Sequence, residues 1–433
     1  MNFTTPSAEF RDPIHGYIYA SEVERTVIDT GVFQRLRRIR QLAGAHLTYP
    51  GAQHSRFEHS VGAMHLAGLS GLSLMSKTAM TEDDIQQMRL AALLHDVGHG
   101  AFSHLFEEVM SEKRGITHEQ MTERVLKETE LKDVLSSAGY GSNDIIELAL
   151  GRPSGKPQFM SETVGGGLSV DIMDYLLRDS YFTGVEYGRI DVHRIINSYE
   201  VMNDKLALDS AALYAFEAFI ISRYEMFKAV YFHRTVRAAE IMLVRAMGLA
   251  DDFLHITDTS DLSHYLSLTD EVVLFQLLSL DPRKNRQLEE AKKLAVGYAN
   301  RKLWKCVFEK TVHRKDRLIE RIFSQKGIRD QIASQIADEA GVDANQILID
   351  VPTTPSVPFT SARESLETLA LMTKGAEGRR YQTISVNELP LVSAITGFVD
   401  ILRVYTPAEF RERVEAAAES FFGKEGFMTK ISV

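Results

Sequence analysis

The sequence predicts a mainly α-helical protein, with a large helical body and a smaller C-terminal region that mixes helices and strands. Long stretches carry apolar residues at helical spacing, and strand-like segments are sparse before residue 340. Beyond that point short β-branched runs and prolines appear. We therefore expect a helical body over residues 1–325 and a C-terminal α+β region over residues 326–433, suited to regulation or oligomerisation.

Four segments of the body carry the helical pattern most clearly: 86–97, 144–150, 211–249 and 270–280. The third contains no proline and no glycine before Gly248, so it predicts one long helix or two nearly continuous ones. In the C-terminal region, a β-branched run within 346–359 is followed by three prolines, and 379–386 alternates as an edge strand does. Residues 408–426 return to a helical pattern.

Composition limits the class of protein and its partners. The chain is 44% hydrophobic and 25% charged, as globular proteins are, and no stretch approaches the roughly 20 apolar residues that cross a bilayer. No secretory pattern opens the chain, and the single cysteine, Cys306, cannot form an internal disulfide, so we expect a cytoplasmic protein and no membrane partner. A net charge of −10 makes nucleic acid an unlikely main partner.

The segment LLHDVGHGAFSH, residues 93–104, raises the question of chemistry. His95 and Asp96 end an apolar helical stretch and can reach one metal ion beside it, since imidazole and carboxylate both suit divalent transition metals. Two donors are too few for a catalytic metal, so further ligands must come from elsewhere. His59, near the start of a helix of small residues, and Asp171, on a later helical segment, are the candidates.

The order of these residues resembles that of the HD superfamily of metal-dependent phosphohydrolases. A wider set of motifs resembles the SAM-and-HD-domain deoxynucleoside triphosphate triphosphohydrolases and their prokaryotic relatives: FRDPIHGYI, TGVFQRLRRIRQLAG, YPGAQHSRFEHSVG, LLHDVGHGAFSH, THEQ and DIMDYLLRDS. The resemblance covers roughly residues 9 to 310 and implies a helical HD-domain body without the SAM domain. It also implies the reaction, hydrolysis of a deoxynucleoside triphosphate (dNTP) to a deoxynucleoside and triphosphate.

The resemblance assigns the metal and the proton transfer. One divalent cation (Mn, Fe, Ni, Zn or Mg) would be held by His59, His95, Asp96 and Asp171. The 5′-oxygen of the sugar is a poor leaving group, so a general acid is needed, and His104 matches that position. The other residues implied around the phosphates are His99, His118 and Arg56.

The resemblance also assigns contacts to the nucleoside and to an activator. Gln41 and Asp179 would bind the 3′-hydroxyl, Leu42 would press on the 2′ carbon, and Tyr175 would pack near the sugar. A second, activating guanine nucleotide would bind at an allosteric site, and its binding would drive assembly of a homo-oligomer, a dimer or a tetramer. The residues implied for that second site are Asp29, Gln34 and Arg37.

The chain departs from the family pattern at Ala8, Ile172, Arg237, Ala239 and Glu240. Four of these changes replace a cationic or histidine side chain, which weakens the expectation of an activator. In the family pattern a lysine contacts a phosphate at the position that Ile172 occupies in this chain. Arg237 could make that phosphate contact instead. That hypothesis rests on charge alone.

Several residues have structural readings beside functional ones. Asp174 is read as a carboxylate that stabilises its helix, His15 as a brace for a turn, and His54 as structural or a neighbour of the ligands. For function, the alternatives are another HD-type phosphodiesterase or nuclease, and a nucleotide sensor without turnover. The sugar-binding residues argue against a nuclease, and an intact His104 argues against a sensor.

Overall fold

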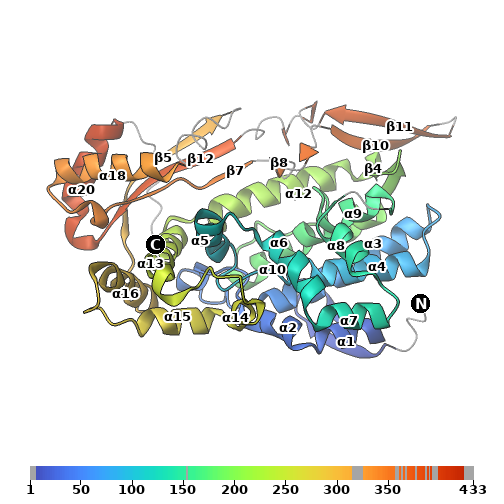
Figure 1. The fold of residues 1–433 in the computed structure, drawn as a ribbon. Helices are drawn as coiled ribbons and strands as arrows, with labels where there is room; N and C mark the ends of the chain where they lie inside the picture. The colour runs from blue at the N-terminus through green and yellow to red at the C-terminus, as the bar shows by residue number, and fades with distance from the viewer. Residues whose placement is uncertain are drawn as a thin grey trace.

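The computed structural model describes residues 6–152, 155–314, 325–355, 360–361, 364–365, 368–375, 378–385, 388–389, 391–392 and 398–423. It confirms a mainly α fold with a large helical body and a smaller C-terminal region that contains strands (Figure 1). The helices of the first half are α1 (Glu22–Ile28), α2 (Gly31–Gln34), α3 (Arg56–Met75), α4 (Glu82–Leu94), α5 (His104–Arg114), α6 (His118–Glu128), α7 (Glu130–Ser137), α8 (Ser142–Ala149), α9 (Gln158–Gly165), α10 (Val170–Thr183) and α11 (Val192–Asn197).

The second half of the body continues with helices and ends in the mixed region. Its helices are α12 (Leu213–Met226), α13 (Arg234–Leu254), α14 (Leu262–Ser267), α15 (Asp270–Leu278) and α16 (Arg286–Ala299). The C-terminal region adds α18 (Lys326–Ala340) and α20 (Arg411–Phe422). The predicted segment 211–249 is two helices, joined by the π-helical turn η4 (Phe227–Tyr231).

Strands are more frequent before residue 340 than the sequence predicts. They are β1 (Ala8–Asp12), β2 (Gly16–Ala20), β3 (Tyr199–Met202), β4 (Lys205–Asp209) and β5 (Lys305–Arg314). The hairpins β1–β2 and β3–β4 consist of strands of four or five residues, too short to give a clear alternation. The later strands are β6 (Leu348–Asp350), β7 (Thr353–Pro355), β8 (Thr360–Ser361), β9 (Glu364–Ser365), β10 (Thr368–Gly375), β11 (Gly378–Ser385) and β12 (Phe398–Thr406).

Two four-stranded sheets join the C-terminal region to the body. One has the order β11-β10-β4-β3, with β10 parallel to β4 through Leu371 and Leu208, and β11 is the predicted edge strand. In the other, the central strand β12 pairs with β5, β6 and β7. Strands β3, β4 and β5 precede residue 325, so both sheets combine strands from the two sides of the predicted domain boundary. The division into two domains stays a prediction.

The centre of the body is the packing of α3 against α4 and α10. Small residues on α3 allow close approach, because a Cβ on Gly71 would come within 2.9 Å of the Ile85 side chain of α4. The buried side chains around these helices form the largest apolar cluster. This packing brings the N-terminal turn of α3, the C-terminal end of α4 and the first turn of α10 together.

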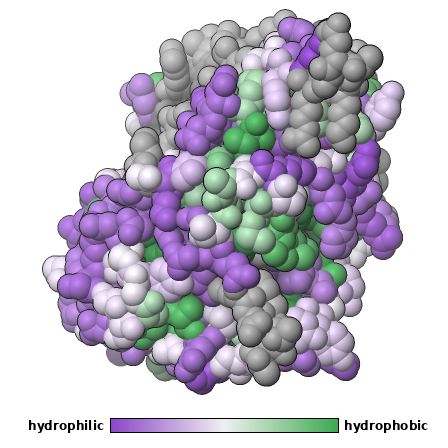
Figure 2. Space-filling model, turned by 90° about the vertical axis from the view of Figure 1, so that its right-hand side faces the viewer, coloured by the Kyte–Doolittle hydropathy of each residue, from purple (hydrophilic) through white to green (hydrophobic). Residues whose placement is uncertain are grey.

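The face of the molecule in Figure 2 mixes hydrophilic residues with smaller hydrophobic areas. Among the helices that the structure describes, none is long and apolar enough to cross a membrane.

Candidate metal centre

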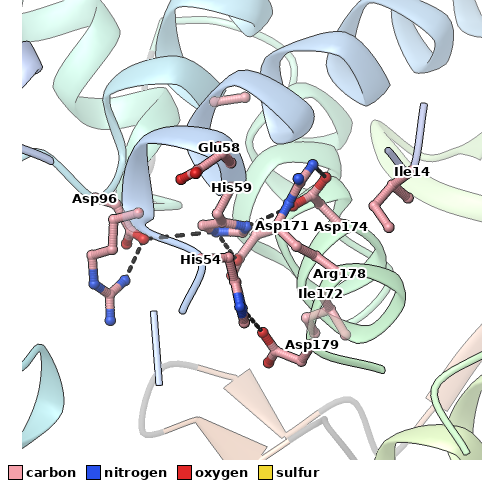
Figure 3. A network of polar contacts seen from close by, with 12 residues as sticks. Ile14, His54, Glu58, His59, Asp96, Asp171, Ile172, Asp174, Arg178 and Asp179 are labelled. Atoms are coloured by element: carbon pink, nitrogen blue, oxygen red, sulfur yellow. Dashed lines mark hydrogen bonds and ion pairs between the residues drawn. The ribbon is translucent and has the colours of Figure 1, made fainter. Parts of the chain in front are cut away.

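Three helix ends deliver the four predicted metal ligands. His59 lies in the first turn of α3, which begins after Ser55, where Glu58 accepts a hydrogen bond from the Ser55 backbone. His95 is the C-cap of α4. Asp171 lies in the first turn of α10, whose N-cap Ser169 accepts from a backbone N–H of that turn. Figure 3 shows His59, Asp96 and Asp171 pointing toward one another from these elements.

The ligand atoms converge on one point. His59 Nε2 lies 3.3 Å from His95 Nε2 and 3.1 Å from Asp171 Oδ1. Asp96 Oδ1 lies 3.3 Å from His95 Nε2, and Asp171 Oδ1 lies 3.6 Å from that same nitrogen. Two ligands at about 2.1 Å from a tetrahedral metal lie about 3.4 Å apart, so these separations fit one ion.

The other ring nitrogens fix the tautomers that such an ion requires. His95 Nδ1 donates to the Ala92 carbonyl at 2.7 Å, and His59 Nδ1 donates to Asp174 Oδ2 at 2.9 Å. With the proton on Nδ1, each Nε2 presents a lone pair, and both lone pairs face the same space. Two lone pairs beside two carboxylates need a cation between them, so the donor set fits a divalent metal.

The charges of the ligands lead to the same conclusion. Burial lowers the pKa of His59, but the Asp171 and Asp174 carboxylates outweigh it and raise that pKa to about 10. Burial raises the pKa of Asp171, yet His59 and His95 hold it below its ordinary value. The carboxylates thus attract positive charge to the imidazoles, and protons and a metal cation compete for the same Nε2 atoms.

Arg56 is buried in this centre. Its Nη1 pairs with Asp96 and its Nε donates to Ser103 Oγ at 2.7 Å. Its Nη2 is buried without a hydrogen-bond partner among the described residues. The residue predicted to hold phosphate is thus brought to the metal ligands, with one donor still unused.

A group of histidines lies beside Asp96. The rings of His99 and His118 stack with centroids 4.0 Å apart, and the His104 ring lies 5.0 Å from that of His99. Glu107 accepts from His118 Nδ1 at 2.7 Å and lies 3.4 Å from His104 Nδ1. His104 has a side chain that is 71% exposed, so it can meet a ligand from solvent. Glu107 was not among the predicted site residues, although its place three residues after His104 on a helix was a usable signal.

The predicted sugar contacts lie on the other side of the centre. Asp179 is buried and accepts from His54 Nε2 at 2.7 Å and from the Tyr231 hydroxyl at 2.7 Å. The Gln41 backbone N–H donates to the His54 carbonyl at 3.0 Å, which brings Gln41 to the same place, and its Oε1 is buried without a partner in the described part of the chain. His54 thus holds Asp179 in place through a hydrogen bond, in keeping with the structural role considered for it. Tyr231 and the π-helical turn that carries it were not predicted.

Two further sugar-side residues complete this group. Leu42 follows Gln41 and is half-buried. Tyr175 lies one turn after Asp171 on α10, and its hydroxyl accepts from Arg223 Nε at 3.3 Å. Arg223 was not predicted either, because α12 reads as an ordinary core helix from its sequence.

The residues predicted for a second nucleotide lie at the end of α1 (Asp29), at the end of α2 (Gln34) and in the 3-10 turn η1 (Arg35–Arg38) that follows α2 (Arg37). Arg37 Nε donates to Gln34 Oε1 at 2.8 Å, and the Arg37 guanidinium lies 3.4 Å from the centre of the Phe57 ring. Asp29 is exposed and pairs with Arg25 at 3.1 Å. Gln34 and Arg37 are therefore brought together, while Asp29 is paired within its own helix.

Arg237 does not support the hypothesis of a phosphate contact. It pairs with Asp350 at 2.8 Å and with Glu240 at 2.7 Å, between α13 and the C-terminal sheet. The Arg237 side chain is only 15% exposed, so its charge is committed to these acids. The hypothesis considered charge alone and left out the acids of β6 and α13.

The comparisons with known proteins agree with this site. The model of the HD domain matches residues 56–179, and that of the HD associated region matches 190–430. Uncharacterized protein YwfO of Bacillus subtilis is 33% identical over 316 residues, covering 69% of this chain and 71% of that protein.

Two curated enzymes are also similar. The deoxynucleoside triphosphate triphosphohydrolase SAMHD1 of Mus musculus is 32% identical over 359 residues, and its homolog in Dictyostelium discoideum is 33% identical over 312 residues. Each match covers 69% of this chain, which spans 54% of the mouse enzyme and 59% of the Dictyostelium one.

Solved structures extend the likeness over almost the whole chain. A protein from Aquifex aeolicus, described as hypothetical, matches with a TM-score of 0.73 and 29% identity, over 95% of this chain and 99% of that one. A phosphohydrolase from Bacteroides thetaiotaomicron matches with a TM-score of 0.72 at 23% identity, over 92% and 99%, which shows the shared fold. The chain therefore belongs to the HD-domain phosphohydrolases and is related to the SAMHD1 triphosphohydrolases.

Proposed function

We propose that this protein is a metal-dependent dNTP triphosphohydrolase, which converts a dNTP and water to a deoxynucleoside and triphosphate. The observation that carries the proposal is the convergence of His59, His95, Asp96 and Asp171 beside a group of histidines and buried, unused polar atoms. A divalent metal held there would activate water and offset charge on the phosphoryl oxygens. The relatives named as triphosphohydrolases support the choice of substrate.

Proton transfer to the leaving sugar oxygen falls to His104. Its ring is exposed toward solvent, next to the stacked pair of His99 and His118. Glu107 orients both His104 and His118 through their Nδ1 atoms, which leaves each Nε2 for the ligand. Burial lowers the pKa of His99 well below its ordinary value, and Arg56 lowers it further, so His99 stays neutral beside the phosphates.

Unpartnered buried atoms indicate where the substrate would bind. Polar groups that are buried in the free protein normally have partners. Several buried side-chain atoms of the described residues have none, and Arg56 Nη2, Gln41 Oε1 and His99 Nδ1 are those that belong to the predicted site residues. We assign Arg56 Nη2 and His99 Nδ1, each as an N–H donor, to the phosphates. The Gln41 amide, turned to present its NH₂ group, would donate to the oxygen of the 3′-hydroxyl.

On the sugar side, Asp179 would accept from the 3′-hydroxyl, Tyr175 would pack against the ring and Leu42 would leave no room at the 2′ carbon. Asp179 is 2% exposed, and it is held in place by His54 and Tyr231. A residue so enclosed suits a single nucleotide better than a polymer. We also propose an activating nucleotide at Asp29, Gln34 and Arg37, and a homo-oligomer, both on the strength of the family resemblance.

The test is product analysis by ion-exchange chromatography. Purified protein is incubated with each dNTP, singly and mixed, with Mn²⁺ or Mg²⁺, beside a His95→Ala, Asp96→Ala double variant and a single-stranded DNA substrate. Deoxynucleoside and triphosphate, absent with the variant, are the expected products. Release of monophosphate would instead indicate a phosphodiesterase, and cleavage of DNA alone would indicate a nuclease. Nucleotide binding without any product would indicate a sensor.

A further inference from the structure

Asp174 lies behind the metal centre, on the opposite side of the His59 ring from the metal-facing nitrogen (Figure 3). Both of its oxygens are fully engaged. Oδ2 accepts from His59 Nδ1 at 2.9 Å and from Arg178 Nε at 2.8 Å, while Oδ1 accepts from His15 Nε2 at 2.7 Å and from Arg178 Nη2 at 2.9 Å. Its side chain has no exposed surface. Asp174 is therefore not placed to bind the metal itself.

We propose that Asp174 is a positioning residue that makes His59 a metal ligand, and that the loop between β1 and β2 holds Asp174 in place. This inference rests on the proposed metal centre. An ionised carboxylate can only accept hydrogen bonds, so each of its nitrogen partners must carry a proton. His59 is thereby locked with its proton on Nδ1 and its Nε2 lone pair directed to the ligand cluster.

The position of Asp174 is determined in turn by Arg178 and the N-terminal hairpin. Arg178 lies one turn later on α10, is completely buried, and pairs through Nη1 with Asp12 Oδ2 at 2.7 Å. The other oxygen of Asp12 accepts from the backbone N–H groups of Ile14 and His15, at 2.8 and 2.9 Å. The β1–β2 loop is therefore joined to the metal centre through buried, charged hydrogen bonds, which are stronger than neutral ones.

Helix α3 provides the space that Asp174 needs. A Cβ added to Gly62 would overlap Asp174 Oδ1 and the Arg178 guanidinium. Gly62 is one turn after His59 on the same helix, so it faces the same side. With four hydrogen bonds holding it, the carboxylate could not move aside without losing partners. The glycine thus belongs to the arrangement that orients His59.

The experiment measures Mn²⁺ affinity by isothermal titration calorimetry, with thermal unfolding in EDTA as a separate measure of stability. In Asp174→Asn, an amide N–H facing His59 would drive the histidine proton to Nε2, where the metal would bind. We expect Mn²⁺ affinity to fall roughly 10- to 100-fold. The matched control is Glu24→Gln, which removes another buried carboxylate paired with an arginine, Arg89, at 2.6 Å. It should lower stability and leave the affinity for Mn²⁺ unchanged.

A second pair of variants covers the case in which Asp174→Asn does not fold. Gly62→Ala displaces Asp174 without removing it, whereas Gly71→Ala adds the same methyl group to α3 against the Ile85 side chain. Weaker Mn²⁺ binding only in Gly62→Ala would support the proposal. Equal affinity in wild type, Asp174→Asn and Gly62→Ala would overturn it, as would an equal loss in the controls. If the wild type bound no divalent metal, the proposed function would fail and this inference with it. If the wild type binds Mn²⁺ and His95→Ala does not, the metal centre is supported, and unchanged affinity in Asp174→Asn and Gly62→Ala would then overturn the role of Asp174 alone.

Discussion

His59 and His95 face each other through their Nε2 atoms at 3.3 Å, and in the neutral rings these nitrogens carry lone pairs, because each Nδ1 keeps its proton and donates it in a hydrogen bond. Such an arrangement is unfavourable without a cation, because two lone pairs and two carboxylates share the same space. The two histidines are 36 positions apart in sequence, and α3 and α4 bring them together because small side chains on α3 let the helices pack closely.

The first prediction concerns loss of the metal. His95→Ala removes one imidazole donor and should reduce the bound metal of the purified protein severalfold, with loss of turnover. Metal content is measured by inductively coupled plasma mass spectrometry, and turnover by release of triphosphate. Treatment of the wild type with a chelator should abolish turnover, and readdition of Mn²⁺ should restore it. Full turnover after chelation would contradict the proposed role of the metal.

The second prediction concerns Glu107. Burial raises the pKa of the Glu107 carboxyl, but the hydrogen bonds with His104 and His118 outweigh burial. Together they hold this pKa well below its ordinary value. Glu107→Gln should weaken the orientation of both histidines and lower kcat about 10-fold or more, with little change in KM, because general acid–base groups typically contribute 10²- to 10⁴-fold. Steady-state kinetics with one dNTP would decide, and an unchanged kcat would show that Glu107 is not needed to orient His104.

The helices with strong periodicity were predictable from sequence, and the weak strands were not. The pattern of 270–280 corresponds to α15, and that of 144–150 to α8, since each buries one apolar face. The pairing of β10 with β4 joins residues more than 150 positions apart, and local patterns carry no information on such contacts. The π-helical turn after α12 likewise was not predicted, because it is a single turn of five residues within a long apolar helical pattern.

The metal ligands could be proposed from their order and residue types, but their supports could not. Nothing local in the sequence distinguishes Asp174, which orients His59, from Asp179, which His54 holds. Three-dimensional contacts assign the two carboxylates different partners. The same limit explains Arg237, whose partner Asp350 lies 113 positions away.

A third prediction addresses the proposed second nucleotide site. Arg37 is exposed on the surface and contacts Gln34 and the Phe57 ring, away from the hydrogen bonds of the metal centre. Arg37→Ala should remove any stimulation that GTP or dGTP gives to hydrolysis of another dNTP, while metal content stays at the wild-type level. Rates with and without added GTP measure this effect. Undiminished stimulation in the variant would place the activator elsewhere.

A fourth prediction concerns Arg237. Replacing it with Met keeps the aliphatic bulk but leaves Asp350 and Glu240 without their cation, and breaking a buried ion pair typically costs about 3–5 kcal/mol. Arg237→Met should therefore unfold at a lower urea concentration, with an unchanged KM for dNTPs. A raised KM at unchanged stability would support the earlier hypothesis that Arg237 contacts a phosphate of the substrate.

The last prediction is a pH dependence of stability centred on Glu240. Burial raises its pKa; Arg237 opposes this, Asp350 and Glu108 add to it, and the result is about 7 against an ordinary value of 4.5. Between these values the folded protein holds a proton that the unfolded chain releases, so this contribution to stability is full below pH 4.5 and is lost as the pH rises through 7. Its size is at most about 3 kcal/mol, from 1.36 kcal/mol per pKa unit.

Glu240→Gln removes that titration and keeps the size of the side chain. The free energy of unfolding of the variant should therefore rise relative to wild type as the pH increases from 5 to 8, by up to about 3 kcal/mol. Urea denaturation at pH 5, 6.5 and 8 measures the difference, with Glu289→Gln, on the surface of α16, as a matched control that should follow the wild type. A constant difference between Glu240→Gln and wild type across this range would mean that Arg237 keeps Glu240 ionised throughout.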